Sequence, residues 1–128
     1  MDFFLDLLIL LSCGFILGME RSHSHNIIGV RTISLVLLGS FMFTYISTQI
    51  GGDPARIIAQ VVTGIGFLGA GLIFKDSSKN IQNLTTAVLV WCISALGCMT
   101  ALSMRYEALM FTLIIYIILK VYKRLIAK

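Results

Sequence analysis

The chain has 128 residues, of which 58% are hydrophobic and only 12% are charged. A soluble domain of ordinary composition carries about twice that charge density, and a globule this small exposes too much surface to hide so many apolar side chains from water. The composition therefore excludes a soluble globular domain. The net charge of +4 would suggest nucleic acid as the partner of a soluble protein, but here membrane topology explains it better, and we expect no nucleic-acid partner.

Five apolar runs follow one another along the chain, each roughly long enough to cross a bilayer at about 1.5 Å of rise per residue. Their expected bounds are 3–19, 33–50, 57–74, 84–102 and 106–122. They predict an all-α polytopic membrane protein, a bundle of five transmembrane helices forming the single domain 1–128. The first run has neither a basic start nor a small-residue cleavage site, so we interpret it as a retained span. Cys13, Cys92 and Cys98 lie inside the runs, and we expect buried thiols and no disulfide framework.

The charged residues are sorted between the two faces of this bundle. With five spans the connections alternate sides, which places eight basic residues on one face and two, Arg56 and Arg105, on the other. The positive-inside rule then predicts that the N-terminus is outside and the C-terminus is cytoplasmic.

Two helix starts have their own chemistry. Asp53 precedes Pro54, so its carboxylate is expected to cap the third helix while proline occupies the first helical position, where no N–H is needed. The connection from Lys75 to Asn83 is polar, and we expect Asn83 or one of the threonines that follow it to cap the fourth helix.

The third run contains four glycines in eight residues. Gly64-x-Gly66-x-x-Gly69 matches the dinucleotide fingerprint by letter, but the acid expected about 20 residues later is missing. Ala70 stands where a Walker motif needs lysine. On a helix, small residues instead line up in stripes that let neighbouring backbones approach closely. The predicted helix-packing residues are Ala59, Gly64, Gly66, Gly69, Ala70 and Gly71.

A sharper interpretation of the same helix is that Gln60 and Thr63 line a small polar site, because polar groups inside a membrane seek partners. Both interpretations stay open at this point.

Several ordered motifs together resemble the MgtC/SapB membrane-domain family over about residues 14 to 97. They are Gly18-Met19-Glu20-Arg21, Gly29-Val30-Arg31-Thr32, Asp53-Pro54-Ala55-Arg56-Ile57-Ile58-Ala59-Gln60, Gly64-Ile65-Gly66-Phe67-Leu68-Gly69-Ala70-Gly71, and Leu84-Thr85-Thr86-Ala87 with Trp91-Cys92. The combination is far more specific than any one motif.

The resemblance implies a five-helix domain in the bacterial inner membrane, linked to growth at low magnesium and, in pathogens, to survival inside macrophages. It further implies a regulatory partner rather than a magnesium transporter, including inhibition of the F-type ATP synthase by the MgtC branch. Many members carry a cytoplasmic C-terminal domain. Because this sequence stops at Lys128, we expect a short form without it.

Two motifs depart from the family pattern. The usual Arg-Gly-Leu-Asn/Thr-Thr before the fourth span appears here as Gln82-Asn83-Leu84-Thr85-Thr86, so a basic residue and a glycine are missing from the turn. The glycine-rich end of the fourth span is reduced to Gly97. Both changes weaken the transfer of any activity that depends on that loop.

Polar residues at the motif positions are the candidate binding residues: Glu20, Arg21, Arg31, Thr32, Arg56, Gln60, Thr63, Thr85 and Thr86. Glu20, Arg21 and Arg31 are predicted to form a cytoplasmic cluster that recognises an anion, a lipid headgroup or a partner protein. The alternative is interface anchoring with an ion pair between Glu20 and Arg31, a contact worth little when exposed.

We expect neither a metal site nor a resident cofactor. Mg²⁺ prefers carboxylates that leave it several waters, and the six acids lie near the two faces. Asp2 and Asp6 share one helical face and would at most attract a cation at the outer mouth. His23 and His25 lack a further ligand at metal-binding spacing. No catalytic arrangement has its members on one side of the membrane, so an enzyme is not expected.

The sequence therefore predicts a regulatory protein that acts by binding membrane lipids, a membrane-protein partner or a second copy of itself. The alternative is a transporter or channel for Mg²⁺ or another cation, with Gln60, Thr63 and the glycine backbone along the path.

Overall fold

The computed structural model describes residues 2–23, 28–77 and 79–126, apart from the side chains of residues 23, 122–124 and 126. Within that part the chain forms five helices and a short hairpin: α1 (Phe3–His23), α2 (Val30–Gln49), α3 (Pro54–Leu72), β1 (Phe74–Lys75), β2 (Ile81–Gln82), α4 (Leu84–Ala101) and α5 (Arg105–Ile126). The expected spans differ from these helices by at most four residues, 19 against 23 and 122 against 126. Four of the helices, α1 to α4, are long and apolar enough to cross a membrane.

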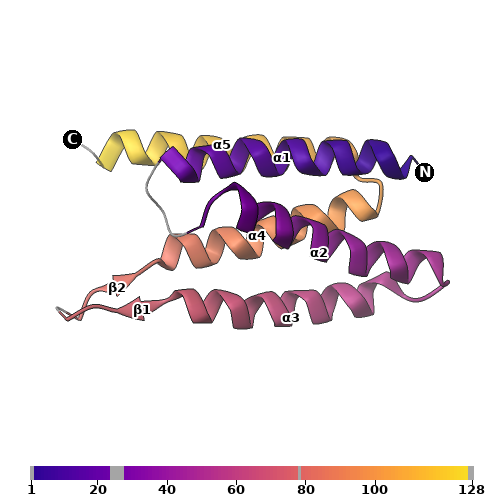
Figure 1. The fold of residues 1–128 in the computed structure, drawn as a ribbon, viewed down its shortest axis with the longest axis horizontal. Helices are drawn as coiled ribbons and strands as arrows, with labels where there is room; N and C mark the ends of the chain where they lie inside the picture. Colours follow the sequence, from indigo (N-terminus) through magenta and orange to yellow (C-terminus); the bar gives the residue numbers. More distant parts are fainter. Residues whose placement is uncertain (1, 24–27, 78, 127–128) are drawn as a thin grey trace.

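The helices run up and down beside one another, with α4 at the centre of the bundle (Figure 1). Helix α4 packs against α2 and α3, while α1 packs against α2 and α5. In the single chain 61% of the α4 span is buried, compared with only 11% of the α3 span. Helix α3 is therefore attached mainly along one side, and most of its surface faces outward.

The core lies between α1, α2 and α4. Its fully buried apolar side chains include Leu10, Leu17, Leu37, Phe41 and Ile93. Gly97 sets the spacing of α2 and α4, because a Cβ there would lie 2.6 Å from the carbonyl oxygen of Leu37. Close approach of two backbones at a glycine is the usual way that helices pack in lipid.

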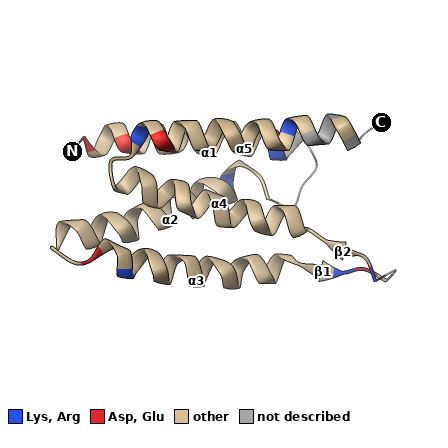
Figure 2. Ribbon diagram, turned by 180° about the vertical axis from the view of Figure 1, so that it is seen from behind, with Lys and Arg blue, Asp and Glu red and all other residues tan. Residues whose placement is uncertain are grey.

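Charged residues lie mainly toward the two ends of the bundle (Figure 2). The end that holds the N-terminus also holds the α2–α3 and α4–α5 connections, and the opposite end holds the β1–β2 hairpin and the C-terminus (Figure 1). The described helices therefore alternate in direction as five spans require.

Helix α3 begins as the Asp-Pro pair predicts: Asp53 Oδ1 accepts a hydrogen bond from the Ala55 N–H at 3.0 Å, and Pro54 is the first helical residue. The start of α4 differs from the expectation. Asn83 occupies the N-cap position but makes no side-chain cap there. Its Nδ2 instead donates to the carbonyl oxygen of Leu72 at 3.2 Å, so the side chain ties the end of α3 to the start of α4.

The connection expected to be a polar loop contains a two-stranded antiparallel hairpin, in which Phe74 pairs with Gln82. Asp76 organises its turn: one carboxylate oxygen accepts from the Asn80 N–H at 2.9 Å, and the other accepts from Gln82 Nε2 at 3.1 Å. Asx side chains commonly satisfy backbone donors in such turns.

Candidate functional site

The structure joins two of the sequence motifs through a buried hydrogen bond. Arg21, at the end of α1, donates from Nη2 to Thr86 Oγ1 at the start of α4, at 2.9 Å. Arg21 is 7% exposed and Thr86 only 2%. Because a buried guanidinium must be matched by acceptors, this contact fixes the end of α1 against the first turn of α4.

Arg21, which was predicted to form a cytoplasmic recognition cluster with Glu20 and Arg31, is thus buried. Arg31 and Thr32, in the first turn of α2, are exposed, and Glu20 is half-buried. Thr85 is exposed although its neighbour Thr86 is buried, since adjacent helical residues point about 100° apart. The motif residues at this end therefore differ in exposure: Arg21 and Thr86 form a buried hydrogen bond, whereas Arg31 is exposed.

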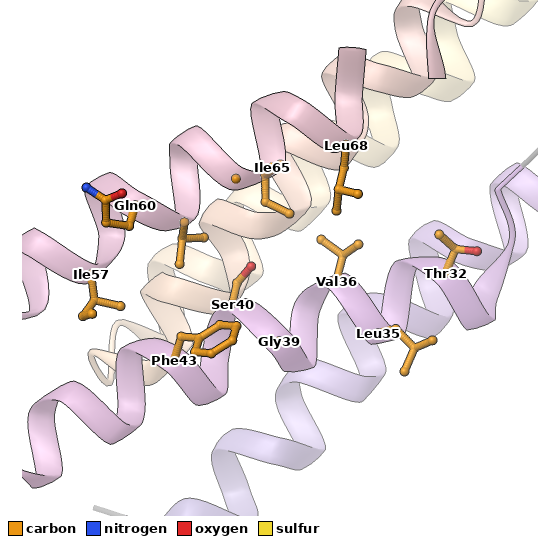
Figure 3. A pocket seen from close by; sticks show the side chains of 12 residues that line it. Thr32, Leu35, Val36, Gly39, Ser40, Phe43, Ile57, Gln60, Ile65 and Leu68 are labelled. Atoms are coloured by element: carbon orange, nitrogen blue, oxygen red, sulfur yellow. The ribbon is translucent and has the colours of Figure 1, made fainter. Parts of the chain in front are cut away.

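A groove of about 640 Å³ runs between α2 and α3 (Figure 3). Six residues of each helix line it, from Thr32 to Phe43 on α2 and from Ile57 to Leu68 on α3. Most of the lining is apolar, and the polar side chains are those of Thr32, Ser40 and Gln60. We call this feature the α2–α3 groove.

Of the two residues predicted to share a polar site, only Gln60 reaches the groove. Thr63 is exposed, and its hydroxyl donates to the carbonyl oxygen of Ala59 at 3.0 Å within the same helix. Gln60 therefore lines the groove, while the Thr63 hydroxyl is satisfied within its own helix.

The small residues of α3 face three directions. Gly69 is buried, and a Cβ built there would be in ordinary van der Waals contact with the Cβ of Ala87 in α4, at 3.8 Å. Gly64 borders the groove. A third set is exposed and lies on what we call the outer face of α3: Ala59, Thr63, Gly66 and Ala70.

Exposed glycines of α3 have open space around them. Apart from the backbone of the same helix, no heavy atom of the described residues lies within 4 Å of a Cβ built at Gly64, Gly66 or Gly71. Of the predicted packing residues of α3, Gly69 is therefore the one that packs against α4 within the described chain. The other predicted packing residues, including Gly71, are exposed.

Sequence reasoning missed a buried ion pair at the other end of the bundle. Asp6 of α1 is fully buried, and its Oδ1 lies 2.6 Å from Nε of Arg105 at the start of α5. The remaining oxygen, Oδ2, has no hydrogen-bond partner among the described residues. The only sequence signal was a carboxylate in the first turn of an apolar helix, since a charge within a membrane is costly unless it is paired.

The residues with possible metal-binding chemistry do not gather. Asp2 is exposed while Asp6 is buried against Arg105. In residues 2–23, 28–77 and 79–126, no three His, Cys, Asp or Glu side chains lie close enough together to hold a metal ion. The side chain of His23 and all of His25 lie outside the described residues.

Residues 7–128 match the MgtC family. The chain is 45% identical over 86 residues to Protein MgtC of Brucella abortus (strain 2308), a match that covers 66% of this chain and 36% of the relative. It is 39% identical over 114 residues to Protein MgtC of Salmonella typhimurium (strain LT2), which covers 88% and 49% respectively. The chain spans about half, or less, of the length of these relatives. No solved structure matches it.

Proposed function

We propose that this chain, which belongs to the MgtC family, is a regulatory protein of the bacterial inner membrane that serves adaptation to low magnesium. In this proposal it catalyses no reaction and acts by binding another membrane protein. Family membership supports the magnesium connection, and the apolar helices support residence in a membrane.

The outer face of α3 is the observation that carries the binding proposal. Ala59, Thr63, Gly66 and Ala70 are exposed, and their spacing places them on one side of the helix. Small residues favour close helix contacts in lipid, where the gain comes from van der Waals packing. A second transmembrane helix fits this face because no group among the described residues packs against a Cβ built at Gly66.

The alternative is transport of Mg²⁺ or another cation along a path lined by Gln60 and Thr63. The buried ionisable groups described above favour regulation, since Asp6 pairs with Arg105 near one end of the bundle and Arg21 bonds Thr86 near the other. A conduction path is expected to use ionisable groups within the bilayer. Transport is therefore the alternative function, and observed ion flux would replace the regulatory proposal with it.

The experiment is crosslinking and co-purification from native membranes with two leucine variants of α3. Gly66→Leu fills the outer face, whereas Gly64→Leu adds the same side chain two residues away, on the groove side. We expect Gly66→Leu to lose the recovered partner, or a crosslinked second copy, and Gly64→Leu to keep it. Sustained Mg²⁺ flux into liposomes that contain the purified protein and a trapped Mg²⁺ dye would contradict a purely regulatory role.

For the orientation we propose that the N-terminus is outside and the hairpin end is cytoplasmic, because the basic residues concentrate at the hairpin end. Single cysteines at Lys79 and Glu107, introduced after the native cysteines are replaced, test this with an impermeant thiol reagent on intact cells. Labelling at position 79 but not at position 107 would show that the hairpin end is outside, which contradicts the proposed orientation.

A further inference from the structure

The α2–α3 groove has the form of a site for one hydrocarbon chain. Its volume of about 640 Å³ lies within the usual range for small-molecule sites. Leu68 of α3 and Val36 of α2 point toward one another across it (Figure 3). Several lining side chains are also open to the surroundings, Leu35 at 69% and Phe43 at 63% exposed. In a bilayer the groove is therefore open sideways to lipid.

Two glycines, one on each helix, make room in the groove. Gly39 of α2 and Gly64 of α3 both line it, and in the part of the chain that the structure describes no heavy atom outside the same helix's backbone lies within 4 Å of a Cβ built at either position. Any larger residue at these positions would occupy the space between the helices. The groove is thus space that the two glycines leave open between the helices, bordered mostly by apolar side chains.

Charge distinguishes the two ends of the groove. Thr32 and Leu68 line one end (Figure 3), and the exposed Arg31 lies four residues before the lining residue Leu35, on the same side of α2. The exposed Lys75 follows α3 at this end of the bundle, and the carboxylate of the adjacent Asp76 accepts hydrogen bonds within the hairpin turn. At the other end Arg56 is accompanied by the carboxylate of Asp53. The Arg31 end is therefore the more positive.

We infer that the groove binds an anionic phospholipid, with one acyl chain between α2 and α3 and the phosphate at Arg31. An arginine presents several N–H donors to a phosphate and is well suited to it. The hydroxyl of Thr32 lies at the same mouth as a further donor. The apolar lining receives the chain, and the arginine selects the charge of the headgroup.

Native mass spectrometry of the purified protein, titrated with dioleoyl phosphatidylglycerol or dioleoyl phosphatidylcholine, tests the inference without any partner protein. We expect one tightly retained phosphatidylglycerol per chain. Its affinity should exceed that of phosphatidylcholine about fivefold, the effect expected for one arginine at an anionic lipid surface. Arg31→Gln should remove this preference, whereas the control Arg56→Gln should keep it.

The two leucine variants of α3 test whether the lipid occupies the groove itself. Gly64→Leu should abolish retention of either lipid, and Gly66→Leu, which adds the same side chain outside the groove, should bind as the unmodified chain does. Equal retention of the two lipids, undiminished binding by Gly64→Leu, or an equal loss in Arg56→Gln would overturn the inference. So would a lipid-free dimer that depends on Gly64, because a second copy would then occupy the groove.

Discussion

The bond between Arg21 and Thr86 predicts a measurable asymmetry between two neighbouring threonines. Thr86→Val keeps the shape of a 2% exposed side chain but removes the oxygen that accepts from Arg21 at 2.9 Å. A hydrogen bond to a charged group contributes about 1.5–3 kcal/mol to stability. Because the guanidinium stays buried after the substitution, we expect the free energy of unfolding to fall by that amount.

The control is Thr85→Val, which makes the same change one residue earlier at an exposed position. An exposed substitution usually changes stability by less than about 0.5 kcal/mol. Thr86→Ser restores a hydroxyl and should recover most of the loss.

The assay is equilibrium unfolding in mixed micelles with increasing SDS, followed by the fluorescence of the single tryptophan, Trp91, which lies in α4 with Thr86. Unchanged stability in Thr86→Val, or an equal loss in Thr85→Val, would show that the bond does not hold α1 to α4.

The same unfolding assay checks three further expectations. Gly97→Ala should cost about 1–3 kcal/mol, as overpacking does, whereas Gly39→Ala, where a Cβ meets no other described side chain or backbone segment within 4 Å, should be neutral or stabilising; equal effects would refute the close approach of α2 and α4. Asn83 has a φ of 62°, so Asn83→Gly should be tolerated better than Asn83→Ala, and the reverse order would contradict a strained turn. At the ion pair, Arg105→Ala should destabilise more than Asp6→Ala, because the carboxylate is fully buried whereas the arginine side chain is 25% exposed; the double variant should recover part of the loss.

The membrane fold was predictable from sequence because lipid leaves few alternatives. Backbone groups in a bilayer must bond within a helix or a closed barrel, so five apolar runs of the right length define five helices to within a few residues. The start of α3 was predictable as well, since the interaction of Asp53 with its own helix is local. Such features depend on neighbours in the chain and hence can be inferred from it.

Contacts between distant segments could not be predicted in this way. Arg21 and Thr86 are 65 residues apart, and Asp6 and Arg105 are 99 apart, so their pairing depends on which helices become neighbours. From the sequence, Arg21 was grouped with Arg31 because both flank one connection, and its bond to Thr86 was not predicted. Helix packing instead turned Arg21 inward.

Asn83 shows how a departure from a family motif can leave the backbone unchanged. Asn83 stands where the family motif has glycine. Its φ of 62° and ψ of 17° lie in the left-handed helical region. Asparagine adopts this conformation more readily than most residues other than glycine. Its side chain also bonds the end of α3, which a glycine cannot do. The missing glycine is therefore weak evidence for a different loop.

The two proposals for α3 can be separated because they use different sides of one helix. Gly64 and Gly66 are two residues apart, so they point about 200° apart around the helix axis. A lipid in the groove would contact both α2 and α3 and would stabilise α3, of which little is buried within the chain. The outer face of α3 would stay open to a partner. Loss of lipid alone in Gly64→Leu and loss of partner alone in Gly66→Leu would establish two independent surfaces. Joint loss in both variants would instead mean that lipid and partner depend on a single conformation of α3.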